Sequence, residues 1–320
     1  MFSKKTTAAI LISLLISIIG VTAQQRQTPP NQNSNSSAGV AAGGAGAPAN
    51  RDSAPSLSRP LPASNVAPIA GVRAVSDGVY RIETPRPLDT AARFLQRKLG
   101  IPISYEEPIW VSAYDLVQAA DLPQNAALRG KYPGWTGNLT PRNGLLDIIL
   151  PMDAQALKST NPAAVLQSVV DSHSKNRNPG EFKLISFGSD EFAIVTTKAE
   201  DKNGNLVVQR SPLEQTVSFP EEERSLKATL ELILNPVHVG LFNAFYDEQK
   251  PRVKAGAKNE KARDVLSRVL RQPGMGKMSW HLNYEPEIKG YVLALTGVQI
   301  EAPDVRGVVR LQTVYWPKAN

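Results

Sequence analysis

One pattern occurs twice in this chain of 320 residues, and it limits the folds that the chain can adopt. Near residue 260 the sequence reads EKARDVLSRVLRQ, then KMSWHLNY, a turn and YVLALTGV. Near residue 161 it reads NPAAVLQSVVDSH, then EFKLISF, a turn and FAIVTT. In both places apolar residues recur at helical spacing and then alternate at strand spacing. This predicts an amphipathic helix followed by a β-hairpin in each half of the chain.

A second helix is expected upstream of each copy, at residues 87–99 and 225–234. Pro87 suits the first turn of a helix, where its missing N–H costs nothing, and Ser225 can cap the other helix. Each half then has the order strand, helix, strand, strand, helix, hairpin. We therefore expect an α+β fold of two tandem small modules, each with two helices packed on small mixed or antiparallel sheets.

The predicted boundaries follow from this order. The first module covers residues 71–198 and is interrupted by an irregular insert at 113–144, which contains KYPGWTGNLTPRNG. A connection at 199–212 leads to the second module at 213–300. Residues 301–320 are expected to form a tail or a final edge strand, because their apolar and polar residues alternate only weakly.

The N-terminus has the layout of a secretory signal peptide. Lys4 and Lys5 precede an apolar run, and small residues come directly before Gln24. We expect residues 1–23 to be removed after Ala23 and the protein to be exported to the periplasm or cell envelope. An uncleaved anchor is the alternative, although the run is short against the ~20 residues of a spanning helix. No later segment is long and apolar enough to cross a membrane.

Residues 24–70 are rich in Pro, Ser, Asn and Gly, and we expect a disordered linker there. The formal net charge is +7, but part of it lies in the signal peptide and the linker. The remaining field is weak, so we expect no nucleic-acid partner and at most a weak attraction to an anionic envelope surface. The chain has no cysteine, which excludes thiol catalysis and thiolate metal sites.

The second half resembles a known family through three stretches: TVSFPEEERSLKATLELIL, VKAGAKNEKARDVLSRVL and KMSWHLNYEPEIKGYVLAL. Their order and spacing are similar to the short N-terminal domain of secretins and TonB-dependent transducers. The resemblance covers residues 213–300, and more loosely residues 78–198. It implies two helices held between two small sheets, and an adaptor that docks another envelope protein.

Reactive residue types are present without a recognisable catalytic spacing. His173, His238 and His281 lie too far apart in the sequence for a metal-binding motif, so we expect no metal and no cofactor. We expect His173 to be solvated at a polar helix end, and His238 and His281 to lie in strands among apolar residues. The acidic groups are expected to be solvated; they are Glu106–Glu107, Glu221–Glu223, Glu285 and Glu287.

The insert supplies the candidate binding residues Tyr132, Trp135, Asn138 and Arg142. Aromatic and arginine side chains on loops are frequent anchors of binding sites. Alternatively, Trp135 covers the core of the first module. We expect a non-enzymatic adaptor that contacts envelope proteins, with a secretin- or transport-associated assembly as one setting. The alternative is a cell-wall hydrolase whose catalytic site is assembled from distant residues.

Overall fold

The computed structural model describes residues 66–242, 251–273, 275–305 and 307–317. The predicted signal peptide and residues 24–65 of the predicted linker lie outside these ranges. The chain divides into two units at Pro62, and every described residue belongs to the second unit. No helix in the described ranges is long and apolar enough to span a membrane.

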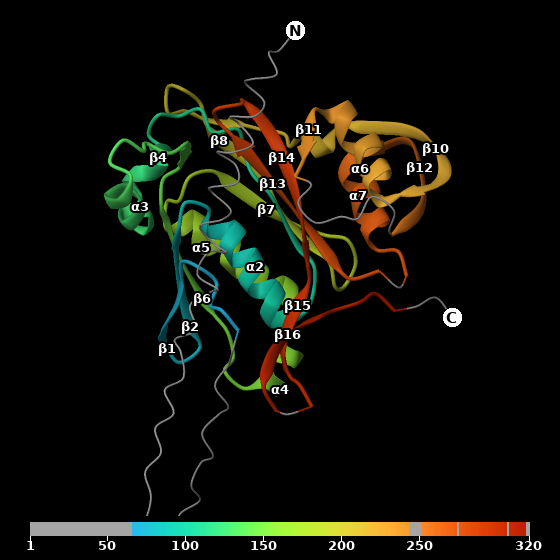
Figure 1. Ribbon diagram of the computed structural model, residues 1–320, viewed down its shortest axis with the longest axis horizontal. Helices are drawn as coiled ribbons and strands as arrows, with labels where there is room; N and C mark the ends of the chain where they lie inside the picture. The colour runs from blue at the N-terminus through green and yellow to red at the C-terminus, as the bar shows by residue number, and fades with distance from the viewer. Residues whose placement is uncertain (1–65, 243–250, 274, 306, 318–320) are drawn as a thin grey trace, which may run out of the picture. The chain divides into compact units, whose positions relative to one another are not determined.

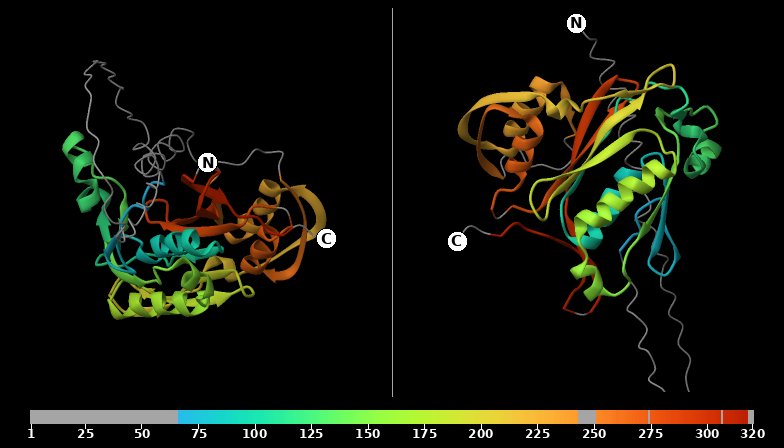
Figure 2. Two further views of the ribbon diagram at one scale, coloured as in Figure 1. Left: turned by 90° about the horizontal axis from the view of Figure 1, so that it is seen from below. Right: turned by 180° about the vertical axis from the view of Figure 1, so that it is seen from behind.

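The first half of the described chain contains a three-stranded antiparallel sheet, two long helices and three strands of a larger sheet. The three-stranded sheet is formed by β1 (Val72–Ser76), β2 (Val79–Thr84) and β6 (Gly144–Ile149). The helices are α2 (Pro87–Leu99) and α5 (Pro162–Lys175), which pack side by side (Figure 2). The other strands are β3 (Ile103–Glu106), β7 (Glu181–Ser186) and β8 (Phe192–Glu200).

The second half has the same order of elements. Its small antiparallel sheet pairs β10 (Thr216–Ser225) with β12 (Arg252–Lys261). Its helices are α6 (Leu226–Leu234) and α7 (Ala262–Leu270), and its other strands are β11 (Val239–Leu241), β13 (Met278–Glu285) and β14 (Gly290–Gly297). In both halves the strand after the first helix lies parallel to the last strand of the hairpin, as β3 with β8 and β11 with β14.

Strands from both halves join one seven-stranded mixed sheet with the order β11-β14-β13-β3-β8-β7, and β9 (Leu206–Val208) also pairs with β8 (Figure 1). The halves meet where β3 lies parallel to β13, with His281 opposite Tyr105 and Leu282 opposite Glu106. The expected mixture of helices and sheets is confirmed. The shared sheet was not expected, because each half was predicted to have only small sheets of its own.

Two apolar cores lie on opposite faces of the shared sheet. Successive residues of a strand point to opposite faces. Tyr105 on β3 belongs to the core around α2 and α5, whereas the next residue, Glu106, contacts Arg263 on α7. On β13, Trp280 belongs to the core around α6 and α7, whereas His281 contacts Asp89 on α2. Each helix pair therefore covers its own face of the sheet.

Local sequence sets several helix ends as predicted. Pro87 occupies the first turn of α2, and Gly100 ends that helix with a left-handed φ of 68°. The hydroxyl of Ser225 accepts a hydrogen bond from the N–H of Ala228, which confirms the predicted cap of α6.

The remaining elements lie in the insert and after β14. The insert contains β4 (Leu116–Gln118), β5 (Leu139–Pro141), α3 (Ala126–Lys131) and two short 3-10 turns. A short helix, α4 (Ala154–Ser159), precedes α5. Beyond residue 298, β15 (Gln299–Pro303) and β16 (Val309–Thr313) form a hairpin, which reaches the end of α2 through the Lys98–Glu301 ion pair at 3.2 Å.

Candidate functional site

The insert holds three of the predicted binding residues in a loop between α3 and β5. The backbone N–H of Ala119 donates to the carbonyl of Asn138 at 2.8 Å, which fixes the end of the loop against the start of the insert. The ring of Trp135 is half-buried and lies beside Gly137, outside both apolar cores as described above. Tyr132 is 52% exposed, with the Lys131 ammonium 5.3 Å from its ring centroid. Tyr132 is therefore the more exposed of the two aromatic side chains of the loop.

Arg142 has its contacts elsewhere. Its Nε lies 3.7 Å from Oδ1 of the buried Asp115, and its Nη2 donates to the carbonyl of Arg177, just after α5, at 3.4 Å. Its backbone N–H also donates to the carbonyl of Asp115 at 2.7 Å. The contact with Arg177 attaches the insert to the end of α5, and those with Asp115 lie within the insert. None of these contacts brings Arg142 together with Tyr132.

A group of exposed apolar side chains lies next to the insert, on β9 and on the segment that follows β3. The amide of Gln209 holds the two together, because it accepts from the N–H of Ile109 at 2.8 Å and donates to its carbonyl at 3.2 Å. Tyr114, the aromatic residue of the group, is 79% exposed and lies at the start of the insert. We call this group the apolar rim; it consists of Ile109, Val111, Tyr114, Leu206, Val207 and Val208. The sequence had suggested only a connection at 199–212.

Charged groups are buried where the two halves meet. Glu106 accepts two hydrogen bonds from Arg263, at 2.6 and 2.7 Å, and a third from the Trp280 indole at 3.3 Å. Glu107 accepts from Arg86 at 2.7 Å and from the backbone N–H of Tyr284 at 2.8 Å. Both carboxylates are fully buried, so the predicted solvated state of this acid pair is wrong.

A third buried carboxylate lies at the same junction. Glu191, just before β8, accepts from the hydroxyl of Ser267 at 2.8 Å, and Arg271 approaches it at 2.9 Å. Burial raises the pKa of Glu191 to about 7, against the hydrogen bond from Ser267 and the charge of Arg271. Ser267 lies on α7 and Arg271 directly follows that helix. Glu191 therefore has its partners in the second half, and Glu106 and Glu107 each have at least one partner there as well.

Ser279, His281 and Asp89 form a hydroxyl–imidazole–carboxylate series. The Ser279 hydroxyl lies 3.2 Å from Nε2 of His281, and Nδ1 of His281 lies 2.5 Å from Oδ1 of Asp89. Burial opposes the charge on Asp89, yet the charge of Arg93, together with His281, holds the pKa of Asp89 well below its usual range. Burial also lowers the pKa of His281, so the imidazole is neutral near pH 7.

This order of groups is the one that serine hydrolases use to activate a nucleophile. A nucleophile must touch its substrate, and here the side chains of Ser279 and His281 are both 0% exposed. In this conformation the series therefore connects β13 to α2 and leaves no surface of Ser279 for a substrate to reach.

The other two histidines differ from their predicted positions. His173 is buried with its ring edge-on to Phe182, at 5.1 Å between centroids, and burial lowers the pKa of His173 to about 4. The prediction that His173 is solvated is therefore wrong. His173 is buried because α5 packs against β7, and this long-range contact cannot be seen in the sequence of the helix. His238 is exposed after a 3-10 turn, with a φ of 56°, rather than placed in a strand. Among the described residues, no group of three or more histidine, aspartate or glutamate side chains is placed so that it could hold a metal ion.

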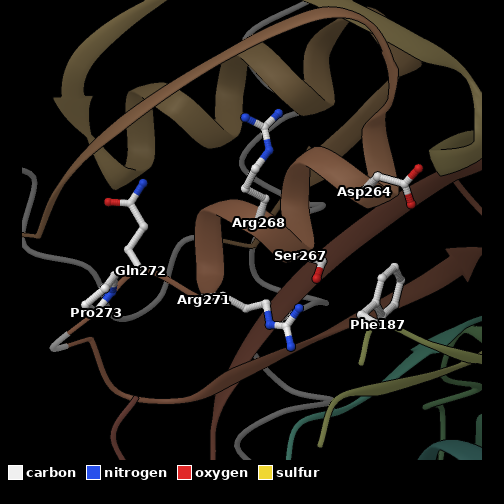
Figure 3. A pocket seen from close by; sticks show the side chains of 7 residues that line it. All are labelled: Phe187, Asp264, Ser267, Arg268, Arg271, Gln272 and Pro273. Carbon is white, nitrogen blue, oxygen red and sulfur yellow. The ribbon is translucent and has the colours of Figure 1, made fainter. Parts of the chain in front are cut away.

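An open groove of about 610 Å³ runs along α7 beside the turn between β7 and β8 (Figure 3). Arg268 and Arg271 leave the helix in different directions, and Phe187 faces the groove from the turn. Both guanidinium groups are already paired, Arg268 with Glu260 at 2.8 Å and Arg271 with Glu191. The groove thus offers an apolar ring and two paired guanidinium groups, beside the carboxylate of Asp264.

No family model matches this chain, and neither a curated protein nor a solved structure matches it. The resemblance to the short domain of secretins and TonB-dependent transducers therefore stays a prediction.

Proposed function

We propose that the two halves are two tandem copies of one small module, of the kind that precedes secretins and TonB-dependent transducers. The strand pairings support this, because each half has two helices between a small antiparallel sheet and a group of three strands. In each group of three, one neighbouring pair is parallel. Equivalent strands also follow each helix in the same order. The insert and the C-terminal hairpin are then additions to the repeated module.

The function that this arrangement supports best is that of an exported, non-enzymatic adaptor in the cell envelope. The apolar rim, together with Tyr132 and Trp135 of the insert, forms its contact surface for an envelope protein. The apolar rim carries this proposal, because exposed apolar side chains on two neighbouring segments are typical of protein-binding surfaces. The buried state of the Ser279 series and of the junction carboxylates favours a role in holding the halves together.

Crosslinking in intact envelopes, followed by purification of the tagged chain, tests the proposal. We expect a discrete partner, and we expect a Tyr114→Ser, Val208→Ser double variant to recover at least ~10-fold less of it. Ile149→Ser is the matched control, because Ile149 is 75% exposed on β6, outside the apolar rim. Equal loss with the control, or no discrete partner with the unaltered chain, would contradict the adaptor function.

A hydrolase is the second candidate, because Ser279, His281 and Asp89 have the required order of contacts. A fluorophosphonate probe, which labels activated serine hydroxyls, separates the two functions. We expect no labelling of the folded chain, since Ser279 is buried. Labelling that disappears in Ser279→Ala and persists in Ser189→Ala, a change of an exposed serine, would favour the hydrolase instead.

A further inference from the structure

The contact between the two halves uses one edge strand from each. Strand β3 of the first half lies beside β13 of the second. By order and pairing, β11 has the place of β3 in the second half, and β7 has the place of β13 in the first. Within the described residues, β7 and β11 are the two end strands of the seven-stranded sheet. Each chain thus has both sides of the same contact, one at each end of its sheet.

We propose that β11 of one chain pairs in parallel with β7 of a second copy, so that the sheet continues from chain to chain. The register follows from the internal contact, in which His281 lies opposite Tyr105. In the first half, Leu184 lies opposite Ile194 on the central strand β8. In the second half, Leu282 lies opposite Leu293 on the central strand β14. If Leu184 is equivalent to Leu282, the preceding residues Lys183 and His281 are equivalent as well. Lys183 then lies beside Leu241 of the next copy.

The backbone directions agree with this register. Phe187 donates to the carbonyl of Glu191 across the β7–β8 hairpin, so by alternation the N–H and C=O groups of Leu184 and Ser186 point away from β8. At the other end, the N–H of Phe242 donates to Leu293 on β14, so those of the preceding residue, Leu241, point away from β14. Two rows of outward backbone groups are therefore available to pair.

The side chains at the new contact are apolar where the internal contact is ionic. Leu266 and Leu166 are equivalent buried residues of α7 and α5, so Arg263 corresponds to Ala163, and Trp280 corresponds to Phe182. The place of Glu106 is taken by Phe242, which is half-buried in the single chain. A phenyl ring beside an alanine and a second phenyl ring replaces a buried ion pair, and no charge needs to be desolvated there.

The charges on the opposite face are of both signs. The positions of Asp89 and Arg93 on α2 correspond to Lys227 and Glu231 on α6, one turn apart. In the second copy these would approach the ion pair between Lys198 and Glu181, which are 2.9 Å apart. Lys183 takes the place of His281 and therefore lies beside Lys227, which takes the place of Asp89, so three positive and two negative groups meet there. The register is favoured by the apolar face and by the backbone directions rather than by these charges.

The absence of cysteine in the sequence makes crosslinking a direct test. Adjacent strands lie ~4.8 Å apart, within the distance that a disulfide can bridge. We expect purified Lys183→Cys mixed with Leu241→Cys to form a disulfide-linked dimer under mild oxidation. Each variant alone should stay at least ~10-fold below that yield, because a head-to-tail contact does not bring identical edges together. Lys183→Cys mixed with Tyr315→Cys, at another exposed position, is the control.

Three results would overturn the proposal: no linked dimer in the mixture, an equal yield with the control, or a Lys183→Cys dimer without its partner. Ser186→Pro in the Lys183→Cys chain should lower the yield several-fold while circular dichroism shows the fold intact, since it removes an outward donor from β7. This inference uses the proposed equivalence of the halves but not the envelope partner. Purified chain reports on the assembly and envelope capture reports on the adaptor, so either can fail alone.

Discussion

The junction between the halves and the insert use the same types of residue in opposite ways. At the junction, Glu106 and Arg263 are buried and bind each other from strands and helices far apart in the sequence. In the insert, Arg142 keeps much of its side chain in water, and Tyr132 is half-exposed. A buried charge is tolerated only with its partner in place, so the junction fixes one arrangement of the halves. An exposed aromatic group is free of that requirement and remains available for contact.

The largest effect should come from breaking the buried ion pair. Arg263→Ala leaves Glu106 buried with only the Trp280 indole as donor, and we expect the free energy of unfolding to fall by ~3–5 kcal/mol. Urea denaturation followed by circular dichroism measures this change. Arg268→Ala on the same helix breaks the half-exposed pair with Glu260 and should cost less than ~1 kcal/mol.

Replacement of both partners sharpens that result. A Glu106→Leu, Arg263→Met chain removes the charges together, so it should regain most of the stability that Arg263→Ala loses. If the double variant is as unstable as the single one, the pair matters through its shape rather than its charge, and the contrast with the insert is lost.

The next effect is a loss of stability at acidic pH, which we expect from the buried His173. His173 has a pKa of about 4 in the folded chain and 6.5 as its ordinary value, so the unfolded chain binds more protons between these values. Stability should therefore fall as pH drops from about 6.5 to about 4, by up to ~3 kcal/mol. His173→Leu should flatten this part of the profile in urea unfolding at several pH values. His238→Gln, at an exposed site, should leave it unchanged, and a slope that survives His173→Leu would contradict the assignment.

Glu191 should give a change of similar size and opposite sign. Its pKa is about 7 in the folded chain and 4.5 as its ordinary value, so the folded chain binds more protons between these values. Stability then falls as pH rises from about 4.5 to about 7, and Glu191→Gln should remove that fall while the amide oxygen still accepts from Ser267. Glu260→Gln is the matched control, and an unchanged profile for Glu191→Gln would exclude this group as its cause.

Much of the secondary structure was predictable because it depends on short stretches of sequence. Helical spacing located α2 and α7, and the cap at Ser225 located the start of α6. The contact of β3 with β13 was not predictable, since either strand alone reads as the edge of a small sheet. Pairing between residues about 176 positions apart depends on the whole fold.

The site was predictable to a similar degree. The aromatic residues of the insert stand out locally, whereas the apolar rim combines two segments about 100 residues apart. Glu106 and Glu107 look solvated in the sequence because two adjacent acids usually are. One signal pointed the other way: Glu106 continues a strand in which Ile103 and Tyr105 alternate, so it faces a second layer if the sheet is covered on both sides.

The smallest effect on stability, and the strongest contrast with the junction, should come from the insert. Tyr132→Ala and Trp135→Ala remove side chains that lie outside both apolar cores. We expect each to lower the free energy of unfolding by less than ~1 kcal/mol, since a partly exposed side chain loses little burial. The same changes should reduce partner recovery from crosslinked envelopes several-fold, while Arg263→Ala acts through unfolding alone. If Trp135→Ala instead destabilises the chain as much as Arg263→Ala, then Trp135 belongs to the framework, and the binding surface is limited to the apolar rim and Tyr132.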